Sequence, residues 1–267
     1  MPTKILFIML DGCRPDALQQ AKTPHLTKLW QEGAYTWTAQ SVMPSVTLPA
    51  HTTLFRGVDP ARHGIGRDNV YQASAAAFPS LMEVATLANR HTAMFYSWEQ
   101  LRDVAPHGSV KMSWCRNADY GLDNDTVVAR AAAAYLTSEQ PDLCFLYMGD
   151  IDISGHLFGW MSPPYIETIE QVDAAVGIVL DALDAAGIRE QYTILAQADH
   201  GGHDTDHGTD LPEDMNIPWI LNGPGIKRGH PIQQRVGLAD TPATLAHLLG
   251  IERPAVWEGQ PVLEALL

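Results

Sequence analysis

ILFIMLDG, residues 5–12, is a run of six apolar residues that ends in an aspartate and a glycine. A continuous apolar run of this length, rich in β-forming residues, is typical of a central strand buried on both faces of a parallel sheet. Asp11 then follows the carboxyl end of this strand. Because ligands of open α/β sheets bind beyond the carboxyl ends of the strands, the stretch predicts an α/β fold and the edge at which a site forms.

Predicted strands and helices alternate along the rest of the chain. Apolar runs predict further strands at residues 91–98, 142–148, 192–196 and 217–221. Periodicity and capping residues predict helices at residues 23–33, 47–55, 80–89, 125–138, 164–186 and 240–249. This alternation predicts a single domain over residues 1–267, with three αβα layers and a mostly parallel central sheet. The stretch 99–122 lacks clear periodicity and is interpreted as a small excursion near the mouth of the site.

The composition narrows the class of ligand. The chain has 267 residues, of which 46% are hydrophobic, and a formal net charge of −14. A nucleic-acid polymer is not expected as a partner, because binding its backbone requires a basic face. A small phosphate ester is compatible with this charge, since bound divalent cations reverse its sign locally. The three cysteines, Cys13, Cys115 and Cys144, show no CxxC spacing, and their odd number does not predict a disulfide framework.

No segment of the sequence has the length of a membrane span. The first apolar run has six residues, which is short for the core of a signal peptide and far too short to cross a bilayer. We therefore expect a cytoplasmic protein with a small-molecule substrate and without a membrane partner. Its oligomeric state is not predicted.

Two pairs of an acid and a histidine follow predicted strands. Asp199 and His200 come after the strand at 192–196, and DISGH, residues 152–156, comes after the strand at 142–148. Asp152 and His156 are four residues apart, so in a helical turn they share one face and can share a metal ion. A polar turn capped by aspartate explains either pair alone. Their recurrence at equivalent strand ends favours a metal site.

Thr47 lies in MPSVTLPAH, residues 43–51, which is typical of a helix start. Pro49 fits the first turn and leaves Thr47 near the N-cap, where free N–H groups and the helix dipole favour a phosphate. A threonine hydroxyl becomes a nucleophile only with a metal ion or a base beside it. Taken alone, Thr47 would be interpreted as a helix cap. Ser45 and Thr52 are weaker candidates for the nucleophile.

Further histidines lie close to these motifs. His203 and His207 fall in DHGGHDTDHGTD, residues 199–210, which is unusually rich in histidines and acids, although a solvated loop can also carry them. His51 and His63 lie near Thr47 and are interpreted as structural hydrogen-bonding residues.

Together these motifs resemble the alkaline phosphatase superfamily, and most of all its nucleotide pyrophosphatase/phosphodiesterase branch. FIMLDGCRPD, residues 7–16, is similar to the metal motif of the first strand, and residues 44–65 are similar to the nucleophile motif. GDIDISGH, residues 149–156, resembles the second-metal motif, and ADHG, residues 198–201, resembles the return to the first metal. The similarity covers nearly the whole chain and implies an alkaline phosphatase-like three-layer fold.

The resemblance implies two divalent metal ions and, position by position, the residues that hold them. One ion would be held by Asp11, Thr47, Asp199 and His200, with Thr47 as the nucleophile. The other would be held by Asp152, His156 and a last histidine. Zinc is the usual ion, and aspartate and histidine ligands also admit manganese.

Two positions of the family pattern fall differently in this chain. The last histidine must lie in the same loop as His200; His207 is favoured and His203 is the alternative. The asparagine that contacts phosphate in the branch counts to Asp68, one residue before Asn69, and we assign it to Asn69.

The implied activity is a metal-dependent phosphodiesterase or nucleotide pyrophosphatase that acts through Thr47. A phosphomonoesterase is an alternative, with Arg14 or Arg67 as the extra cation that a dianion needs, and so is a phosphonate hydrolase. A sulfatase is disfavoured because a Cys-x-Pro-x-Arg signature is missing at Thr47. Two further alternatives are a catalytically inactive metal-binding module and unrelated polar loops on an ordinary α/β domain.

Overall fold

The structure is a computed structural model that describes residues 4–66, 73–106, 108–117 and 121–267. Within these residues the strands are β1 (Lys4–Leu10), β2 (Ala34–Gln40), β3 (Thr92–Tyr96), β4 (Met112–Cys115), β5 (Leu143–Met148), β6 (Tyr192–Gln197), β7 (Asn216–Asn222) and β8 (His230–Pro231). They form one sheet in the order β4-β3-β5-β1-β6-β7-β2-β8.

The sheet is parallel around its centre and reverses direction near one edge. β1 is parallel to β5 on one side and to β6 on the other, and β3 and β4 continue the parallel part beyond β5. β7 is antiparallel to both β6 and β2. Residues 5–10 of β1 are fully buried, as expected for a strand covered on both faces. The predicted mostly parallel sheet is therefore confirmed.

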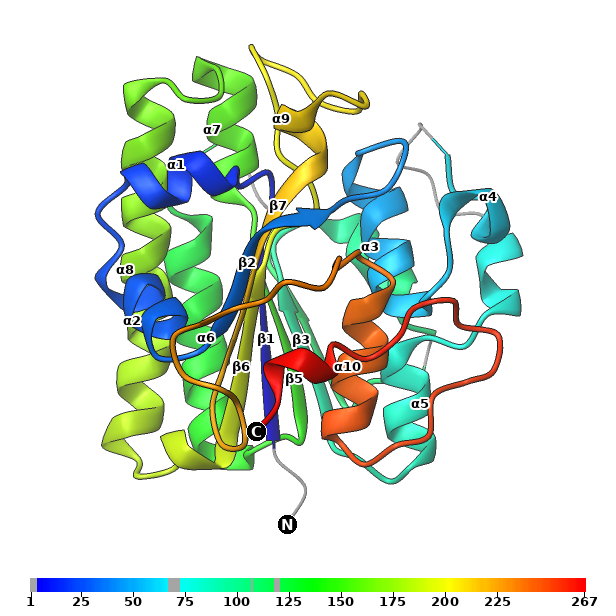
Figure 1. Ribbon diagram of the computed structural model, residues 1–267. Coiled ribbons are helices and arrows are strands. Elements are labelled where there is room, and N and C mark those ends of the chain that lie inside the picture. The colour runs from blue at the N-terminus through cyan, green and yellow to red at the C-terminus, as the bar shows by residue number, and fades with distance from the viewer. Residues whose placement is uncertain (1–3, 67–72, 107, 118–120) are drawn as a thin grey trace.

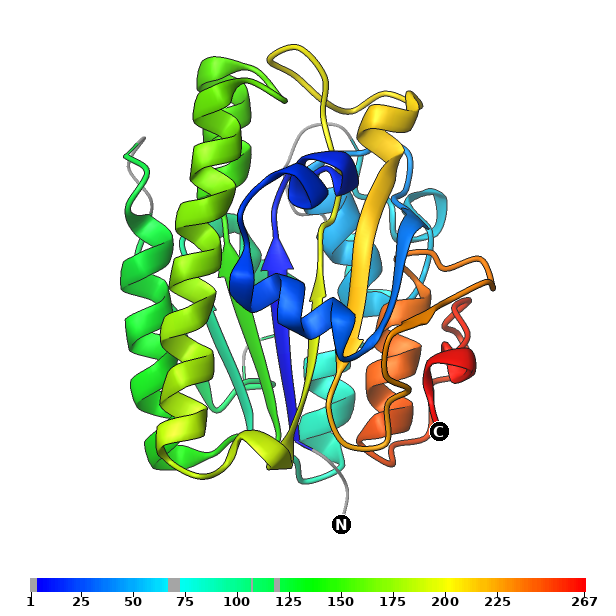
Figure 2. The same cartoon turned by 60° about the vertical axis from the view of Figure 1, so that its left-hand side comes forward.

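Helices cover both faces of this sheet (Figures 1 and 2). One layer contains α1 (Pro15–Gln20), α2 (Pro24–Gln31), α6 (Asn124–Glu139), α7 (Asp150–Phe158) and α8 (Pro163–Ala185). The other contains α3 (Thr47–Arg56), α4 (Pro60–His63), α5 (Leu81–Leu87) and α10 (Asp240–Leu248). Connections contain α9 (Pro212–Met215) and the 3-10 segments Ala73–Ala77, Glu99–Val104, Arg189–Gln191 and Leu263–Ala265. The three αβα layers are thus confirmed. None of the helices described combines the length and apolarity that a bilayer span requires.

The sequence patterns predict neither β2 nor β4. β2 alternates between buried and partly exposed residues and pairs with β7 antiparallel, so it has no continuous apolar run. β4 is an edge strand of four residues with alternating exposure, parallel to β3. It belongs to the stretch 99–122, which was expected to be an excursion; residues 112–115 of that stretch are instead part of the main sheet.

Three loops meet at the carboxyl edge of β1, β5 and β6. Leu10 pairs with Met148, and Met9 pairs with Gln197, so the three strands end at the same level. Gly12 permits the close approach that follows: its φ is +69°, and a Cβ there would lie 3.0 Å from Asp152. The residues that follow each strand are thereby gathered into one place.

Candidate metal centre

The structure brings seven of the predicted site residues together at this edge. They come from four separate parts of the chain: Asp11, Thr47, Asp152, His156, Asp199, His200 and His207. We divide the acidic and histidine side chains into a deep cluster of Asp11, Asp199 and His200 and an open cluster of Asp152, His156 and His207.

The deep cluster is enclosed by protein. His200 Nε2 lies 3.3 Å from Asp11 Oδ1 and 3.4 Å from Asp199 Oδ2, and all three side chains are fully buried. Within the described residues, neither of these two carboxylate oxygens has a hydrogen-bond partner. A buried carboxylate oxygen without a partner is costly, and a cation removes that cost. The deep cluster therefore has the donor set and the unfilled acceptor capacity of a metal site.

Thr47 lies beside the deep cluster. It is the first residue of α3, and Val46 takes the N-cap position that the sequence pattern assigned to Thr47. Its Oγ1 is 3.2 Å from His200 Nε2, and its side chain also lines a cavity. The hydroxyl is thus near both the metal-ligating groups and the space that a substrate can enter.

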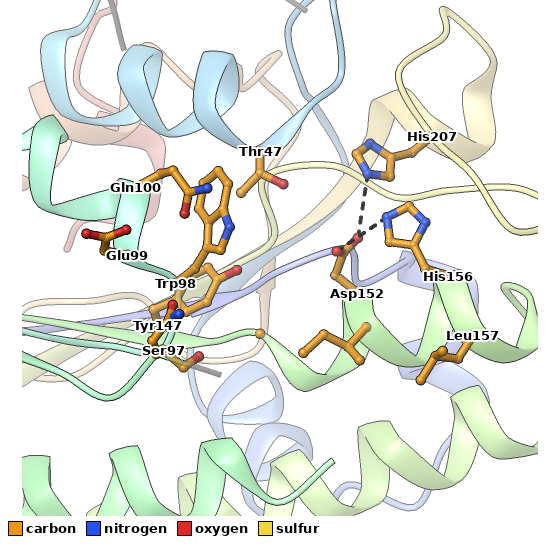
Figure 3. Close-up of a pocket in the computed structure, with 13 residues that line it drawn as sticks. Thr47, Ser97, Trp98, Glu99, Gln100, Tyr147, Asp152, His156, Leu157 and His207 are labelled. Carbon is orange, nitrogen blue, oxygen red and sulfur yellow. Dashed lines mark ion pairs between the residues drawn. The ribbon is translucent and has the colours of Figure 1, made fainter. Parts of the chain in front are cut away.

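The open cluster faces the same cavity (Figure 3). Asp152 lies between two histidines: its Oδ1 is 3.7 Å from His207 Nε2, and its Oδ2 is 3.5 Å from His156 Nε2. The Asp152 and His156 side chains share one face of α7, as their spacing predicted. The rings of His200 and His207 stack at 3.9 Å, and ligand atoms of Asp152, His200 and His207 all lie within 4.8 Å of one another. His200 therefore joins the two clusters.

The histidines of both clusters are oriented by backbone carbonyl groups. Their Nδ1–O distances are 2.8 Å for His200 with Gly201, 2.8 Å for His207 with Ser45 and 2.9 Å for His156 with Thr205. A carbonyl oxygen can only accept, so Nδ1 carries the hydrogen. In a neutral imidazole Nε2 then carries the lone pair and faces the carboxylates, which is the tautomer that a metal ligand requires.

Tyr147 orients one carboxylate of the deep cluster, and His51 lies close to the other. The Tyr147 hydroxyl donates to Asp11 Oδ2 at 2.5 Å, and His51 Nδ1 lies 3.3 Å from Asp199 Oδ2. His51 Nδ1 is also 2.9 Å from the carbonyl oxygen of Thr47. His51, which the sequence analysis interpreted as a structural hydrogen-bonding residue, thus lies between Asp199 and the backbone of Thr47. Tyr147 was not identified from the sequence, because an aromatic residue in an apolar strand is normally part of the core.

Burial and neighbouring charges shift the pKa values of several groups at the site. Burial, followed by the charges of Asp199 and Asp152, raises the pKa of Asp11 well above its usual range. Burial also acts to raise the pKa of Asp199, but His200 and His51 outweigh it and hold that pKa below its ordinary value. Burial and then His200 lower the pKa of His207 to about 4. His207 is therefore a neutral imidazole at physiological pH, and a cation would relieve the repulsion between the acids.

The alternative last histidine, His203, belongs to neither cluster. Its Nδ1 lies 2.7 Å from Asp214 Oδ1, and Asp214 also accepts hydrogen bonds from the backbone N–H and the hydroxyl of Thr209. His203 thus contacts α9 and not the site. Hydrogen bonding to Asp214 raises the pKa of His203.

The other nucleophile and cation candidates that the sequence offered belong to neither cluster. The Ser45 hydroxyl donates to the carbonyl of Thr209, and the Thr52 hydroxyl donates to the carbonyl of Leu48. The guanidinium of Arg14 forms a bidentate pair with Asp16, at distances of 2.9 and 2.6 Å. The assigned phosphate contact, Asn69, and the second candidate cation, Arg67, both lie outside the described residues.

A cavity of about 620 Å³ opens from the open cluster. Its described lining residues are Thr47, Ser97, Trp98, Glu99, Gln100, Asn117, Tyr147, Gly149, Asp152, Ile153, His156, Leu157 and His207. Figure 3 shows Trp98, Gln100 and Tyr147 across the cavity from Asp152 and His156. The far wall is built by residues 97–100 and 117, so part of the stretch 99–122 does lie at the site. Trp98 was not identified because the sequence assigned it to the end of the predicted strand 91–98, whereas β3 ends at Tyr96. Asn117 was not identified because the elements of the stretch 99–122 are too short to predict.

The sequence of residues 5–224 matches the type I phosphodiesterase / nucleotide pyrophosphatase family. The chain belongs to this family. Among its relatives, the venom phosphodiesterase of Macrovipera lebetinus is 25% identical over 74% of this chain and 25% of its own length. An uncharacterized pyrophosphatase/phosphodiesterase of Schizosaccharomyces pombe is 26% identical over 82% of this chain and 47% of its own length. The chain therefore spans about a quarter to a half of the length of these two relatives.

Solved structures of the alkaline phosphatase-like class share its fold. Murine ectonucleotide pyrophosphatase/phosphodiesterase 5, an inactive threonine-to-alanine variant in complex with AMP, superposes with a TM-score of 0.82 at 17% identity, covering 99% of this chain and 100% of that one. A phosphonate monoester hydrolase from Silicibacter pomeroyi gives a TM-score of 0.78 at 16% identity, covering 99% and 76%. The expected alkaline phosphatase-like fold is therefore confirmed.

Proposed function

We propose that this chain is a metal-dependent phosphodiesterase or nucleotide pyrophosphatase in which Thr47 is the nucleophile. The observation that supports it most is the position of Thr47 Oγ1, which is 3.2 Å from His200 Nε2 and lines the cavity together with Asp152, His156 and His207. The family match supports the hydrolysis of phosphate esters in general terms.

The two clusters fit divalent metal ions. Buried oxygens of Asp11, Asp152 and Asp199 have no hydrogen-bond partner within the described residues, and the Nε2 atoms of His200 and His207 lie beside them. The deep cluster and Thr47 would hold one ion, and the open cluster would hold the other. Bound ions would supply Lewis-acid stabilisation of the negative charge on reacting oxygens. Zinc fits a set of histidine and aspartate ligands, and manganese is the alternative.

The protein itself positions the reacting groups. In the proposed reaction, Thr47 Oγ1 loses its proton and attacks phosphorus, the bond from phosphorus to the leaving oxygen breaks with that oxygen taking up a proton, and a phosphothreonine ester forms. Water then attacks phosphorus and releases Thr47. The amino end of α3 begins at Thr47, so the positive end of the helix dipole favours the phosphoryl group there.

The charge of the cavity favours a diester over a monoester. A monoester dianion carries an additional negative charge and is usually bound by an additional cation. The described lining of the cavity contains Glu99 and Asp152 but neither lysine nor arginine, and Arg14 is paired with Asp16 outside it. A nucleotide ester is the substrate class that the AMP complex of the murine structure supports. A phosphonate monoester, also a single negative charge, is the second candidate, in view of the similar phosphonate hydrolase.

The test is a panel of nitrophenyl substrates with Zn²⁺ or Mn²⁺: a phosphate monoester, a phosphate diester, a phosphonate and a sulfate. We expect the diester to be hydrolysed fastest and Thr47→Ala to lower its turnover by at least about 10³-fold, since the nucleophile is lost. Thr47→Ser, which keeps a hydroxyl, is the matched control. Unchanged turnover in Thr47→Ala would remove Thr47 from the mechanism. Metal binding without turnover of any ester would favour the inactive binding module instead.

A further inference from the structure

Two buried aspartates outside the clusters cap each other's helices. Asp125 belongs to the first turn of α6, and Asp150 is the first residue of α7. Their side chains are 2% and 1% exposed. The function proposed above uses neither carboxylate, yet burying two acids side by side is costly unless every oxygen is satisfied. Their hydrogen bonds explain how that cost is met.

Each carboxylate accepts hydrogen bonds from the amino end of the other helix. Asp125 Oδ1 and Oδ2 accept from the backbone N–H groups of Gly149, at 2.9 Å, and Asp150, at 3.1 Å. Asp150 Oδ2 accepts from the N–H of Asp125 at 3.1 Å, and its Oδ1 accepts from Asn124 Nδ2 at 2.8 Å. All four oxygens are satisfied by N–H donors. We call this arrangement the reciprocal cap.

The reciprocal cap replaces the local caps that both helices lack. Neither Asp123, the N-cap of α6, nor Gly149, the N-cap of α7, makes a side-chain capping hydrogen bond. The first N–H groups of a helix must find acceptors, and a carboxylate is also favoured there by the helix dipole. The position and rotation of α7 thus depend on a side chain that lies 25 residues away from Asp150 in the sequence.

The geometry of α7 links the reciprocal cap to the open cluster. Asp152 lies one turn or less beyond the capped N–H groups, and His156 lies one turn later on the same face. The other end of α7 is fixed by Trp160: its indole packs on Gly155, and its Nε1 donates to the carbonyl of Gly12 at 2.8 Å. A rotation of α7 would move Asp152 and His156 together and would change their distance from His207, which lies on the segment after β6.

We propose that Asp125, held in the reciprocal cap, is a positioning residue for the metal ion of the open cluster. This inference rests on the proposed function, because it assumes that the open cluster binds an ion. Asp125 itself contacts neither cluster. It acts by fixing α7, so its loss is expected to weaken one metal ion selectively and to leave the deep cluster unchanged.

Asp125→Asn tests this proposal with little change of shape. The amide keeps one acceptor but presents an NH₂ group to an N–H donor of α7, which breaks one of the two capping bonds. The measurement is a zinc titration of the metal-free full chain, competed with a chromophoric chelator, which resolves the two binding steps. The step weakened by His156→Ala identifies the open cluster, and the step weakened by Asp199→Ala identifies the deep cluster. We expect Asp125→Asn to weaken zinc binding by about 10- to 100-fold in the step assigned to the open cluster. This range is typical of substitutions next to metal ligands.

Asp173→Asn is the matched control. Asp173 of α8 is also buried, and it caps a helix across space by accepting from the N–H groups of Leu26, at 2.7 Å, and His25, at 3.2 Å. That helix, α2, carries no candidate ligand. Asp173→Asn should therefore lower the urea midpoint as Asp125→Asn does, but leave both zinc steps unchanged.

The outcomes separate this inference from the proposed function. Two unchanged zinc steps in Asp125→Asn, or the same selective loss in Asp173→Asn, would overturn the positioning role while leaving the metal sites in place. A wild-type protein that binds no zinc would overturn the proposed function and this inference together. If Asp125→Asn does not fold, Asp150→Asn, which breaks the α6 side of the reciprocal cap, must show the same selective loss to a smaller degree, and its absence there would contradict the proposal.

Discussion

The deep and open clusters use the same two residue types in different surroundings. The deep cluster is fully buried and is oriented from three directions, by Tyr147, His51 and the backbone of Gly12. In the open cluster the His156 side chain is 42% exposed and that of Asp152 is 17% exposed. The two clusters therefore differ in exposure: the one beside Thr47 is enclosed by protein, and the other is accessible from the cavity. Enclosed ligand sets retain metal ions, whereas a site that admits substrate must keep one side open.

Removal of a deep ligand should have the largest effect. We expect Asp199→Ala to lower kcat/KM for the diester by at least about 10³-fold, because the variant would lose the ion that we propose beside Thr47. It also leaves the buried His51 without its carboxylate. In His156→Ala the loss should be smaller, about 10- to 100-fold, since Asp152 and His207 remain. Steady-state kinetics at saturating zinc compare the two. A larger loss in His156→Ala would reverse the assignment of the clusters.

Stepwise removal of zinc should distinguish the clusters by rate. When the loaded protein is mixed with an excess of chelator, we expect two phases, of which the faster reports the exposed open cluster. The fast phase should be missing in His156→Ala, and Asp199→Ala should lose the slow phase. Stopped-flow absorbance of the zinc–chelator complex measures both. A single phase that neither variant alters would show that the difference in exposure has no consequence for exchange.

Tyr147→Phe should weaken the deep cluster without changing its ligands. The substitution removes the donor to Asp11 Oδ2 and keeps the ring, which also contacts His51. We expect zinc to bind the deep cluster about 10- to 100-fold more weakly and to bind the open cluster as in the wild type. The chelator competition assay reads both steps. Tyr192→Phe, which removes a buried hydroxyl bonded to the carbonyl of Pro141 far from the site, is the matched control and should change neither.

The smallest effect concerns His63, which lies outside both clusters. Burial lowers its pKa to about 4 from the ordinary 6.5. Below pH 6.5 the unfolded chain therefore takes up a proton that the folded chain refuses. The free energy of unfolding should fall between pH 6.5 and 4 and level off below, and His63 should account for about 2 kcal/mol of that fall. Urea denaturation of metal-free wild type and His63→Gln at pH 7.5, 5.5 and 4 measures the difference. Parallel curves for the two proteins would contradict the lowered pKa.

A comparison of β1 with β2 shows which strands could be predicted from the sequence. The run at residues 5–10 predicted a central strand because burial on both faces leaves a continuous apolar signature. β2 is partly exposed on one face. Its tyrosine, tryptophan and threonines favour a strand, but it lacks the continuous apolar run by which the other strands were predicted. The positions of Asp11, Asp152 and Asp199 followed from the same logic as β1, because each comes at or soon after the end of an apolar strand.

Residue type and local order predicted the three-layer fold and the edge at which the site forms, since a strand or a helical turn records its surroundings in neighbouring residues. The full set of side chains that gather there followed from the resemblance of their motifs to a known family. Folding in three dimensions decided the rest. It turned His207 toward Asp152 and His203 toward Asp214, and it placed the Tyr147 hydroxyl on Asp11 and the Asp125 carboxylate on the start of α7. These are single contacts between segments that are distant in the sequence. A hydrogen bond of that kind depends on where two backbones meet, and neither partner carries a local pattern that reveals it.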